Sequence, residues 1–209
     1  MGKPAATDRP CLRSLSHSFT LDFVACFQYQ TEADDFLESL GKRMQEFHLE
    51  LAPEKTRHLE VGRYARANAY RRGEKPKECT FLGMTFFCGK TRHGAFKVKR
   101  KTSRKKLKQS LAQFTDWLRR YRNLLPTGEL LRRAKARVQG HLNYAAITDN
   151  SESCQRYMHL TLRALFKWLN RRSQRKSYTW NGLLQALRHV GWPQVRIRVH
   201  LNPFATLNA

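Results

Sequence analysis

The feature that most constrains the fold is a run of three amphipathic helical patterns between residues 102 and 180. The first begins at Thr102 in the stretch TSRKKLKQSLAQFTDWLRRYRN. Its apolar residues recur at steps of three and four, so they share one face of an α-helix, while Lys and Arg occupy the other face. These apolar residues are Leu107, Leu111, Phe114, Leu118 and Tyr121. The pattern predicts a helix with one buried face and one basic face.

Two further patterns of the same kind follow. One is opened by Thr127 after Pro126 and runs through Leu130, Leu131, Ala134, Val138, Leu142 and Ala145. The other is opened by Ser151 and Glu152 and runs through Tyr157, Leu160, Ala164, Leu165 and Trp168. Three consecutive helices with apolar faces predict a small bundle, and their basic outer faces indicate a polyanionic partner.

Charge is distributed unequally along the chain. The 209 residues carry 40 Lys and Arg against 16 Asp and Glu, a net charge of +24. Residues 1–78 hold 13 basic and 12 acidic side chains, whereas residues 79–209 hold 27 basic and 4 acidic ones. An excess this large indicates binding to an anionic macromolecule. No apolar run approaches the roughly 18 residues that a membrane-spanning helix needs, so we expect nucleic acid and no membrane as the partner.

The N-terminus and the cysteines indicate a cytoplasmic location. The opening MGKPAATDRPCLRS lacks the apolar centre of a secretory signal, and Ala6 stands where a myristoylation motif has Ser or Thr. The five cysteines are odd in number and form no C-x-x-C pair, so we expect reduced thiols. Cys79, Cys88 and His93 lack a fourth ligand and zinc-like spacing, and no metal site is predicted there.

The first half of the chain predicts a mixture of strands and helix. Residues 1–18 lack periodicity and are expected to be irregular, while residues 19–29 are aromatic and β-branched enough for a buried strand or hairpin. Thr31 is expected to cap a helix over residues 31–48. Residues 49–62 predict a strand, a turn and a second strand.

The next segments complete the expected fold. Residues 64–78 predict a polar connection, and residues 79–101 predict two short strands joined by a basic turn at residues 89–94. Beyond the third helical pattern, Leu183, Leu184 and Leu187 predict a further short helix. The expected fold class is therefore α+β, with short antiparallel strands and a helix ahead of a three-helix bundle.

Five short strings, in order along the chain, resemble the reverse transcriptase/maturase proteins encoded by bacterial group II introns. Residues 51–56 (LAPEKT) are similar to the sixth polymerase block of that family, and residues 81–84 (FLGM) to the seventh. The strings similar to the family's thumb, or maturase, domain are GHLNY at 140–144 followed by TDN at 148–150, LNRRSQR at 169–175, and Thr179 with Trp180. The resemblance runs from about Phe19 to the end of the chain.

The resemblance implies a division into domains. Residues 19–101 would be the last part of a polymerase palm, and residues 102–180 a three-helix thumb. An irregular segment at 1–18 would precede them, and a C-terminal extension at 181–209 would follow. The fingers, the first half of the palm and an endonuclease-like module have no counterpart in this chain.

The activity of the family is RNA-directed DNA polymerisation, which uses two metal ions held by three aspartates. One aspartate lies on an early palm strand, and two are adjacent in a Tyr-Ala-Asp-Asp turn. The part of this chain that aligns with the turn reads FTLD at 19–22, so Asp22 is the one remaining family metal ligand and Leu21 stands at the position of the other. An aliphatic side chain has no atom that binds a metal, and a lone carboxylate cannot hold two ions.

A second Ala-Asp-Asp string, at residues 33–35, falls in the first turn of the expected helix, where acids suit the helix dipole. We therefore expect no polymerase activity and no cofactor for the chain alone. Mg²⁺ is expected only if a separate N-terminal reverse-transcriptase fragment completes the palm.

Charge and resemblance together predict the residues that bind RNA. The basic residues from 97 to 108 lack interspersed acids, and like charges this close destabilise one another unless a polyanion is present. The resemblance places His141, Asn143 and Tyr144 near the RNA, while the alternative is that they satisfy groups within the fold. The predicted RNA-binding residues are Lys97, Lys99, Arg100, Lys101, Arg104, Lys105, Lys106, Lys108, His141, Asn143, Tyr144, Arg171, Arg172, Arg175 and Lys176.

The expected function is that of an RNA-binding, maturase-like protein: a truncated reverse transcriptase that binds structured group II intron RNA and assists splicing. Two alternatives stay open. One is a reverse-transcriptase subunit completed by a separate polypeptide with the fingers and early palm. The other is a decayed fragment, which would expose apolar surface around Phe23, Val24 and Phe27.

Overall fold

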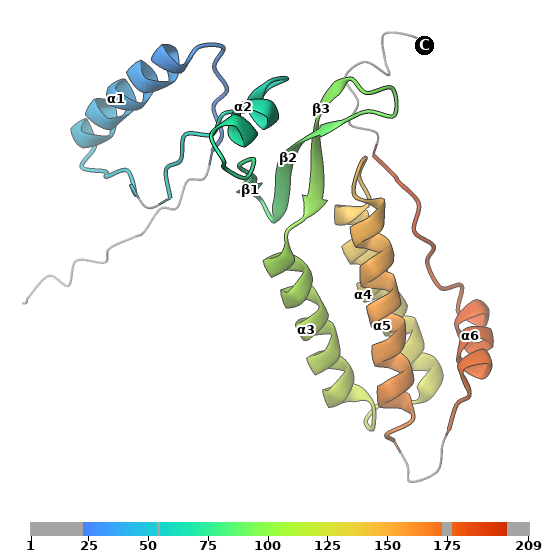
Figure 1. Ribbon diagram of the computed structural model, residues 1–209. Helices are drawn as coiled ribbons and strands as arrows, with labels where there is room; N and C mark the ends of the chain where they lie inside the picture. Colours follow the sequence, from blue (N-terminus) through green and yellow to red (C-terminus); the bar gives the residue numbers. More distant parts are fainter. Residues whose placement is uncertain (1–22, 54, 173–176, 200–209) are drawn as a thin grey trace, which may run out of the picture. The chain divides into compact units, whose positions relative to one another are not determined.

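The computed structural model describes residues 23–53, 55–172 and 177–199 (Figure 1). The chain divides into two compact units, residues 1–51 and residues 52–209. Within the described ranges the secondary structure consists of six helices and one three-stranded antiparallel sheet. The α+β class is therefore confirmed.

The described part of the first unit holds helix α1 (Gln30–Glu46). The backbone N–H of Tyr29 donates to Glu32 Oε2 (3.4 Å), so an acid in the first turn helps to cap the N-terminus of the helix. The predicted helix is confirmed, but it begins at Gln30, so Thr31 lies inside the helix and is not its cap. None of its residues is buried, although Phe36 packs on Phe27 with ring centroids 5.1 Å apart.

The buried strand expected at residues 19–29 is wrong for the part that the structure describes. Residues 23–29 are irregular, because no second strand among the described residues accepts their backbone hydrogen bonds. The side chains of Phe23, Val24 and Phe27 are 46%, 53% and 39% exposed. An aromatic, β-branched composition therefore did not suffice to form a strand here.

The strand, turn and strand expected at residues 49–62 are also wrong. The described residues of this segment are irregular, with a turn in which the backbone N–H and the hydroxyl of Thr56 both donate to the Ala52 carbonyl (3.0 Å each). The polar connection expected at residues 64–78 contains helix α2 (Ala65–Arg71). Its buried residues are two alanines one turn apart, Ala65 and Ala69, and such small residues give a weak periodic signal.

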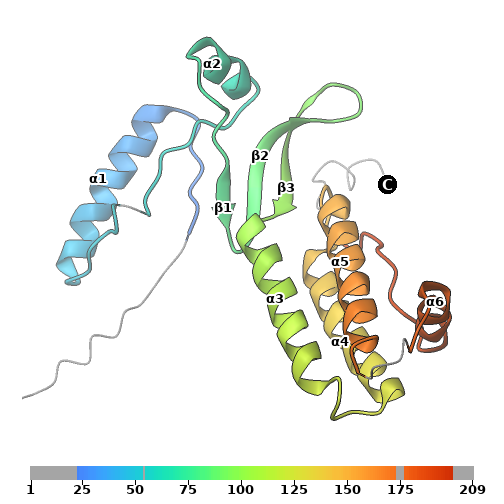
Figure 2. The ribbon, with the colours of Figure 1, turned by 60° about the horizontal axis from the view of Figure 1, so that its bottom comes forward.

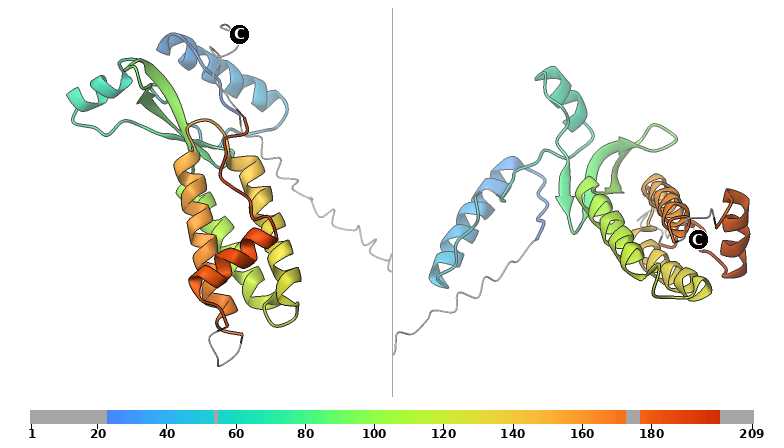
Figure 3. Two further views of the ribbon diagram at one scale, coloured as in Figure 1. Left: turned by 90° about the vertical axis from the view of Figure 1, so that its right-hand side faces the viewer. Right: turned by 90° about the horizontal axis from the view of Figure 1, so that it is seen from below.

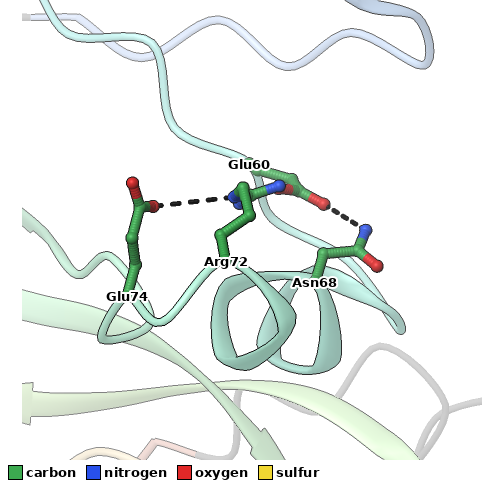
Figure 4. Close-up of polar contacts among 4 residues, drawn as sticks. All are labelled: Glu60, Asn68, Arg72 and Glu74. Carbon is green, nitrogen blue, oxygen red and sulfur yellow. Dashed lines mark hydrogen bonds and ion pairs between the residues drawn. The ribbon is translucent and has the colours of Figure 1, made fainter.

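Polar contacts fix α2 to the segment before it (Figure 4). The Glu60 carboxylate accepts hydrogen bonds from Asn68 Nδ2 (2.7 Å) and Arg72 Nη2 (2.8 Å), and Arg72 also lies 3.6 Å from Glu74. The hydrogen bond from Arg72, and then that from Asn68, lowers the pKa of Glu60. These exposed pairs position α2 but contribute little to stability.

The sheet consists of β1 (Cys79–Phe81), β2 (Met84–Lys90) and β3 (Phe96–Thr102), in the order β1-β2-β3. The sequence predicted two strands here, and β1 was missed. Its connection to β2 is the two-residue turn Leu82 and Gly83, both with positive φ (47° and 75°). Such a turn usually carries Asn or Asp before Gly, so leucine at this position conceals the hairpin.

The three predicted bundle helices are confirmed as α3 (Arg104–Tyr121), α4 (Thr127–Ala145) and α5 (Ser151–Leu169). They lie side by side, with the sheet at one end (Figures 1 and 2). Ser103 caps α3 by accepting a hydrogen bond from the backbone N–H of Lys106 (3.2 Å). The first helix thus begins two residues after Thr102, which ends β3.

The bundle core agrees with the sequence on α4 and differs on α5. All six apolar residues predicted on α4 are buried. On α5, Leu160, Ala164 and Trp168 are only half-buried. The buried stripe consists of Cys154, Tyr157, Thr161, Leu165 and Leu169. Thr161 is fully buried because its hydroxyl donates to the Met158 carbonyl (2.8 Å) in its own helix, so it packs like an apolar residue.

Helix α6 (Trp180–His189) confirms the predicted last helix and crosses the bundle on the side of α4 and α5 (Figure 3). Leu183 and Leu187 enter the core, and Thr179 caps the helix by accepting from Gly182 N–H (3.1 Å). Val199 then pairs with Ile147 as an isolated parallel bridge. Among the described helices, none is both long and apolar enough to cross a membrane.

Candidate nucleic-acid interface

The loop between α4 and α5, residues 146–150, joins the sheet to the bundle. Asn150 is fully buried, and its Oδ1 accepts from the Thr102 backbone N–H (2.7 Å). Its Nδ2 donates to Thr102 Oγ1 and to the Ala145 carbonyl (2.8 Å each). One side chain thus links the end of β3, the end of α4 and the start of α5.

The two residues before Asn150 extend the same junction. Asp149 forms an ion pair with Lys97 of β3 (2.9 Å), and both side chains are mostly buried, with 14% and 22% exposed. The backbone N–H of Thr148 donates to the Val199 carbonyl (3.1 Å). The TDN string at 148–150 is therefore the place where the sheet, the bundle and the C-terminal segment meet.

His141 lies between α4 and α5, and its ring stacks on Tyr157 with centroids 3.7 Å apart and planes 23° apart. Burial lowers the pKa of His141 to about 4, and the nearby Lys106 ammonium acts in the same direction. The ring is therefore neutral near pH 7 and adds no positive charge toward RNA.

Asn143 and Tyr144 also have partners within the chain. Asn143 Oδ1 accepts from Gln139 Nε2 (2.8 Å) and from Arg198 (2.6 Å) in the C-terminal segment. The Tyr144 hydroxyl donates to the Leu82 carbonyl in the β1–β2 turn, while half of the residue stays exposed. These contacts agree with the structural alternative for His141, Asn143 and Tyr144.

The predicted basic cluster divides into two parts, and its β3 members are largely engaged in the fold. Besides Lys97, Lys101 forms an ion pair with Glu78 (2.7 Å) and lies over the Phe87 ring. The stem of Lys99 lies flat over Gly89, where a Cβ would come within 2.8 Å of it. Arg100 is half-buried. These side chains therefore mainly stabilise the sheet, and less of their positive charge is available to a ligand.

The α3 members of the cluster are different, because Arg104, Lys105, Lys106 and Lys108 are all exposed. Their side-chain cations make no hydrogen bond or ion pair with any described residue. The first turn of α3 contains no acid, and cations at a helix N-terminus oppose the helix dipole. This positive charge therefore does not stabilise the helix and is available to an anion.

The last predicted RNA-binding residues follow α5. Arg171 lies over the Trp168 ring, 5.3 Å from its centroid. Arg172 is engaged in the fold, because it donates to Thr127 Oγ1 (2.6 Å) and to the Leu125 carbonyl (3.1 Å). Arg175, Lys176 and Asp22 lie outside the described residues.

Sequence reasoning missed a basic stripe on α5. Arg156, His159, Arg163 and Lys167 are exposed and recur at steps of three, four and four, so they share one face. At 1.5 Å per residue the stripe is about 17 Å long. The signal was in the sequence, as a helical repeat of basic residues parallel to the apolar one.

The acids and thiols offer little competing chemistry. Residues 79–209 contain four acids, and Asp116, Glu129 and Asp149 each pair with Lys or Arg. The described ranges contain no group of three or more His, Cys, Asp or Glu that could hold a metal ion. Their four cysteines are free thiols, and burial raises the pKa of the Cys154 thiol to about 11. The arrangement can bind anions electrostatically.

The fold and this surface define a class of protein: an α+β chain whose described helices present exposed cations without acidic partners. No protein family, no curated protein and no solved structure matches the chain.

Proposed function

We propose that this chain is an RNA-binding protein of the group II intron maturase type. In this proposal it is a truncated reverse transcriptase that binds structured intron RNA and assists splicing. The observation that supports it most is the charge imbalance of residues 79–209, with 27 basic and 4 acidic side chains. Such a surface would help an RNA to fold because it neutralises phosphates that otherwise repel one another.

The placement of the exposed cations supports a polyanion over a small anion. The four at the start of α3, and Arg156, Arg163 and Lys167 in the stripe on α5, are fixed on helices, where side chains three or four positions apart lie roughly 5–6 Å from one another. A nucleic-acid backbone presents charges at regular intervals, and a rigid row of cations complements it. The intron as the RNA in question rests on the five family-like strings alone.

The same resemblance proposes the palm at residues 19–101 and the thumb at residues 102–180. It also implies Mg²⁺ for a completed polymerase, but the donor set of this chain does not fit two ions, because Leu21 stands beside Asp22. No polymerisation step is therefore assigned to the chain.

Two matched variants test the RNA-binding proposal. The first replaces the four exposed α3 cations by glutamine (R104Q, K105Q, K106Q and K108Q). The second replaces four exposed cations in the charge-balanced part of the chain (R57Q, R71Q, K75Q and K77Q), with the same change in net charge.

Affinity for a structured RNA is measured by filter binding at two salt concentrations, with thermal unfolding as the check on folding. We expect the α3 variant to lose on the order of 10- to 100-fold in affinity at low salt and to show a shallower salt dependence. The control variant should stay within about threefold of the wild type. Equal losses in both variants would mean that general charge, and not this surface, binds the RNA.

A second candidate function is that of a reverse-transcriptase subunit completed by a separate N-terminal fragment. It is favoured by the first unit, where α1 has no buried residue and Phe23 and Val24 are about half exposed. Apolar surface of this kind calls for a cover. Co-expression with an upstream fragment followed by a primer-extension assay tests it, and the lone Asp22 carboxylate predicts no extension. A decayed fragment would share the exposed surface but aggregate on purification and bind all RNAs equally weakly.

A further inference from the structure

One aromatic ring on the surface of the bundle gathers four cations. The cations of Arg119, Arg122, Lys167 and Arg171 lie 5.5, 4.7, 5.6 and 5.3 Å from the centroid of the Trp168 ring. No two of them are therefore farther apart than about 11 Å, which is only slightly more than the Debye length of roughly 8 Å at physiological salt. They come from two helices, at the ends of α3 and α5. So dense a group of like charges is costly unless an anion joins it.

The ring forms one wall of an open hollow of about 510 Å³, the Trp168 hollow. Its lining residues are Asp116, Arg119, Arg120, Arg122 and Trp168. The Asp116 carboxylate in this lining would repel an anion. Its side chain is 71% exposed and lies 3.8 Å from Arg119, however, so solvent screens its charge. The hollow is thus open to a ligand and strongly positive.

Arg122 distinguishes this hollow from a merely basic surface. Its Nε and Nη1 are buried and donate no hydrogen bond to the described part of the chain. Buried guanidinium donors are nearly always paired. Arg172, at the same end of the bundle, shows the usual situation, because it donates to Thr127 and Leu125. The guanidinium of Arg122 is instead held over Trp168. Its Nη2, which is not among the buried atoms, is the donor that a ligand in the hollow can reach.

The helix dipole explains only part of this arrangement. Arg119 and Lys167 lie in the last turns of α3 and α5, where cations interact favourably with the free carbonyls. Arg122 follows the end of α3 and donates no side-chain hydrogen bond to those carbonyls. The helix dipole therefore favours its charge at this end of α3 but does not account for its unpaired donors.

We propose that the Trp168 hollow is a phosphate-binding site, in which Arg122 makes the specific contact and the other cations supply the field. A guanidinium held by an aromatic ring keeps its in-plane N–H groups for a ligand, and the Nη2 N–H groups of Arg122 can donate to a phosphate oxygen in a charge-assisted hydrogen bond. The cation–π contact fixes the guanidinium in advance, which lowers the entropy lost on binding. The inference deepens the proposed function, and rests on it where the phosphate is taken to be that of an RNA backbone. The α5 stripe runs from Arg156 to Lys167, whose ammonium lies 5.6 Å from the centroid of the Trp168 ring.

The ¹H–¹⁵N spectrum of the arginine Nε–H groups of the whole chain tests the site, with the Arg122 signal identified by its loss in R122Q. The probes are a short hairpin RNA and, separately, inorganic phosphate. We expect the Arg122 signal to shift with the RNA, and R122Q to weaken RNA binding roughly tenfold. W168L, which keeps the arginine but removes its support, should weaken it similarly. The control R188Q removes one exposed cation from α6 and should change the affinity less than twofold.

The outcomes separate this site from the proposed function. RNA binding with an unchanged Arg122 signal, and with R122Q no weaker than R188Q, would overturn the site and leave RNA binding by the other cations intact. A shift with inorganic phosphate but no RNA binding would support the site with free phosphate as its ligand and overturn the proposed function. Thermal unfolding of R122Q and W168L shows whether a loss of affinity reflects the contact or the fold.

Discussion

Replacing Asn150 by alanine removes the side chain that holds the sheet against the bundle. Its three hydrogen bonds to Thr102 and Ala145 are lost. The buried Thr102 N–H is left without a partner, while the Ala145 carbonyl keeps the hydrogen bond from the Ile147 backbone N–H (2.8 Å). At about 1 kcal/mol for each bond, with a further penalty for unpaired buried groups, N150A should lower the free energy of unfolding by about 3–4 kcal/mol. In a unit of this size that corresponds to a fall in melting temperature of about 6–15 °C.

Asn150→Asp separates the donor role from the acceptor role of the same side chain. The carboxylate still accepts from Thr102 N–H, but it cannot donate to the Ala145 carbonyl and is buried without a cation. We expect N150D to be as destabilised as N150A at pH 7 and to recover part of the loss as the pH falls toward 5, because the protonated acid donates one bond and carries no charge.

Urea unfolding followed by circular dichroism measures both variants, with N143A as the control. Asn143 is exposed and accepts its two hydrogen bonds in solvent, so its loss should cost less than about 1 kcal/mol. If N150A unfolded within 1 kcal/mol of the wild type, the buried amide would not be what joins β3 to the bundle.

Three further predictions concern the core and the polar residues near it. Protonation of His141, whose folded pKa is lowered from 6.5 to about 4, favours the unfolded state. Stability should therefore be fully present above pH 6.5 and fall by about 1–2 kcal/mol as the pH drops toward 4, allowing for the partial exposure of the ring. H141Q should lack this dependence, and an NMR titration of the imidazole protons gives the pKa. L142A, at a fully packed position, should cost about 2–5 kcal/mol in urea unfolding, and L160A, at a half-buried one, should cost less. R172Q should cost about 1–3 kcal/mol in stability because it loses two bonds, yet leave RNA affinity within about twofold, which filter binding measures. A large loss of affinity with unchanged stability would instead assign Arg172 to the RNA.

The helices were predictable because their signal is periodic and local. The α4 pattern named every residue that is buried on that helix. The same reasoning failed where burial or strand formation depends on a hydrogen bond or a backbone angle, because neither leaves a periodic pattern in the sequence. Thr161 was omitted from the α5 face because its hydroxyl is satisfied inside the helix, and β1 was missed because Leu82 occupies a turn position with positive φ.

The candidate site was predictable in its total charge but not in its distribution. Composition alone indicated an anionic partner. Whether a given cation is available depends on partners far away in sequence, as Lys97 pairs with Asp149 from 52 positions away. The structure therefore moves the strongest candidates from β3 to the start of α3 and the stripe on α5. The palm and thumb division and the intron as the partner stay predictions.

The central claim is that rigid helices of this chain bind structured intron RNA through their unpaired cations. Its most direct test is filter binding of the purified chain to the group II intron RNA nearest its gene, and to an unrelated structured RNA of equal length, at 50 and 200 mM salt. With about six phosphates neutralised, affinity for the intron should fall by on the order of a thousandfold between the two salt concentrations, and the intron should bind more tightly at both. A flat salt dependence, or equal weak binding to the two RNAs, would contradict the claim.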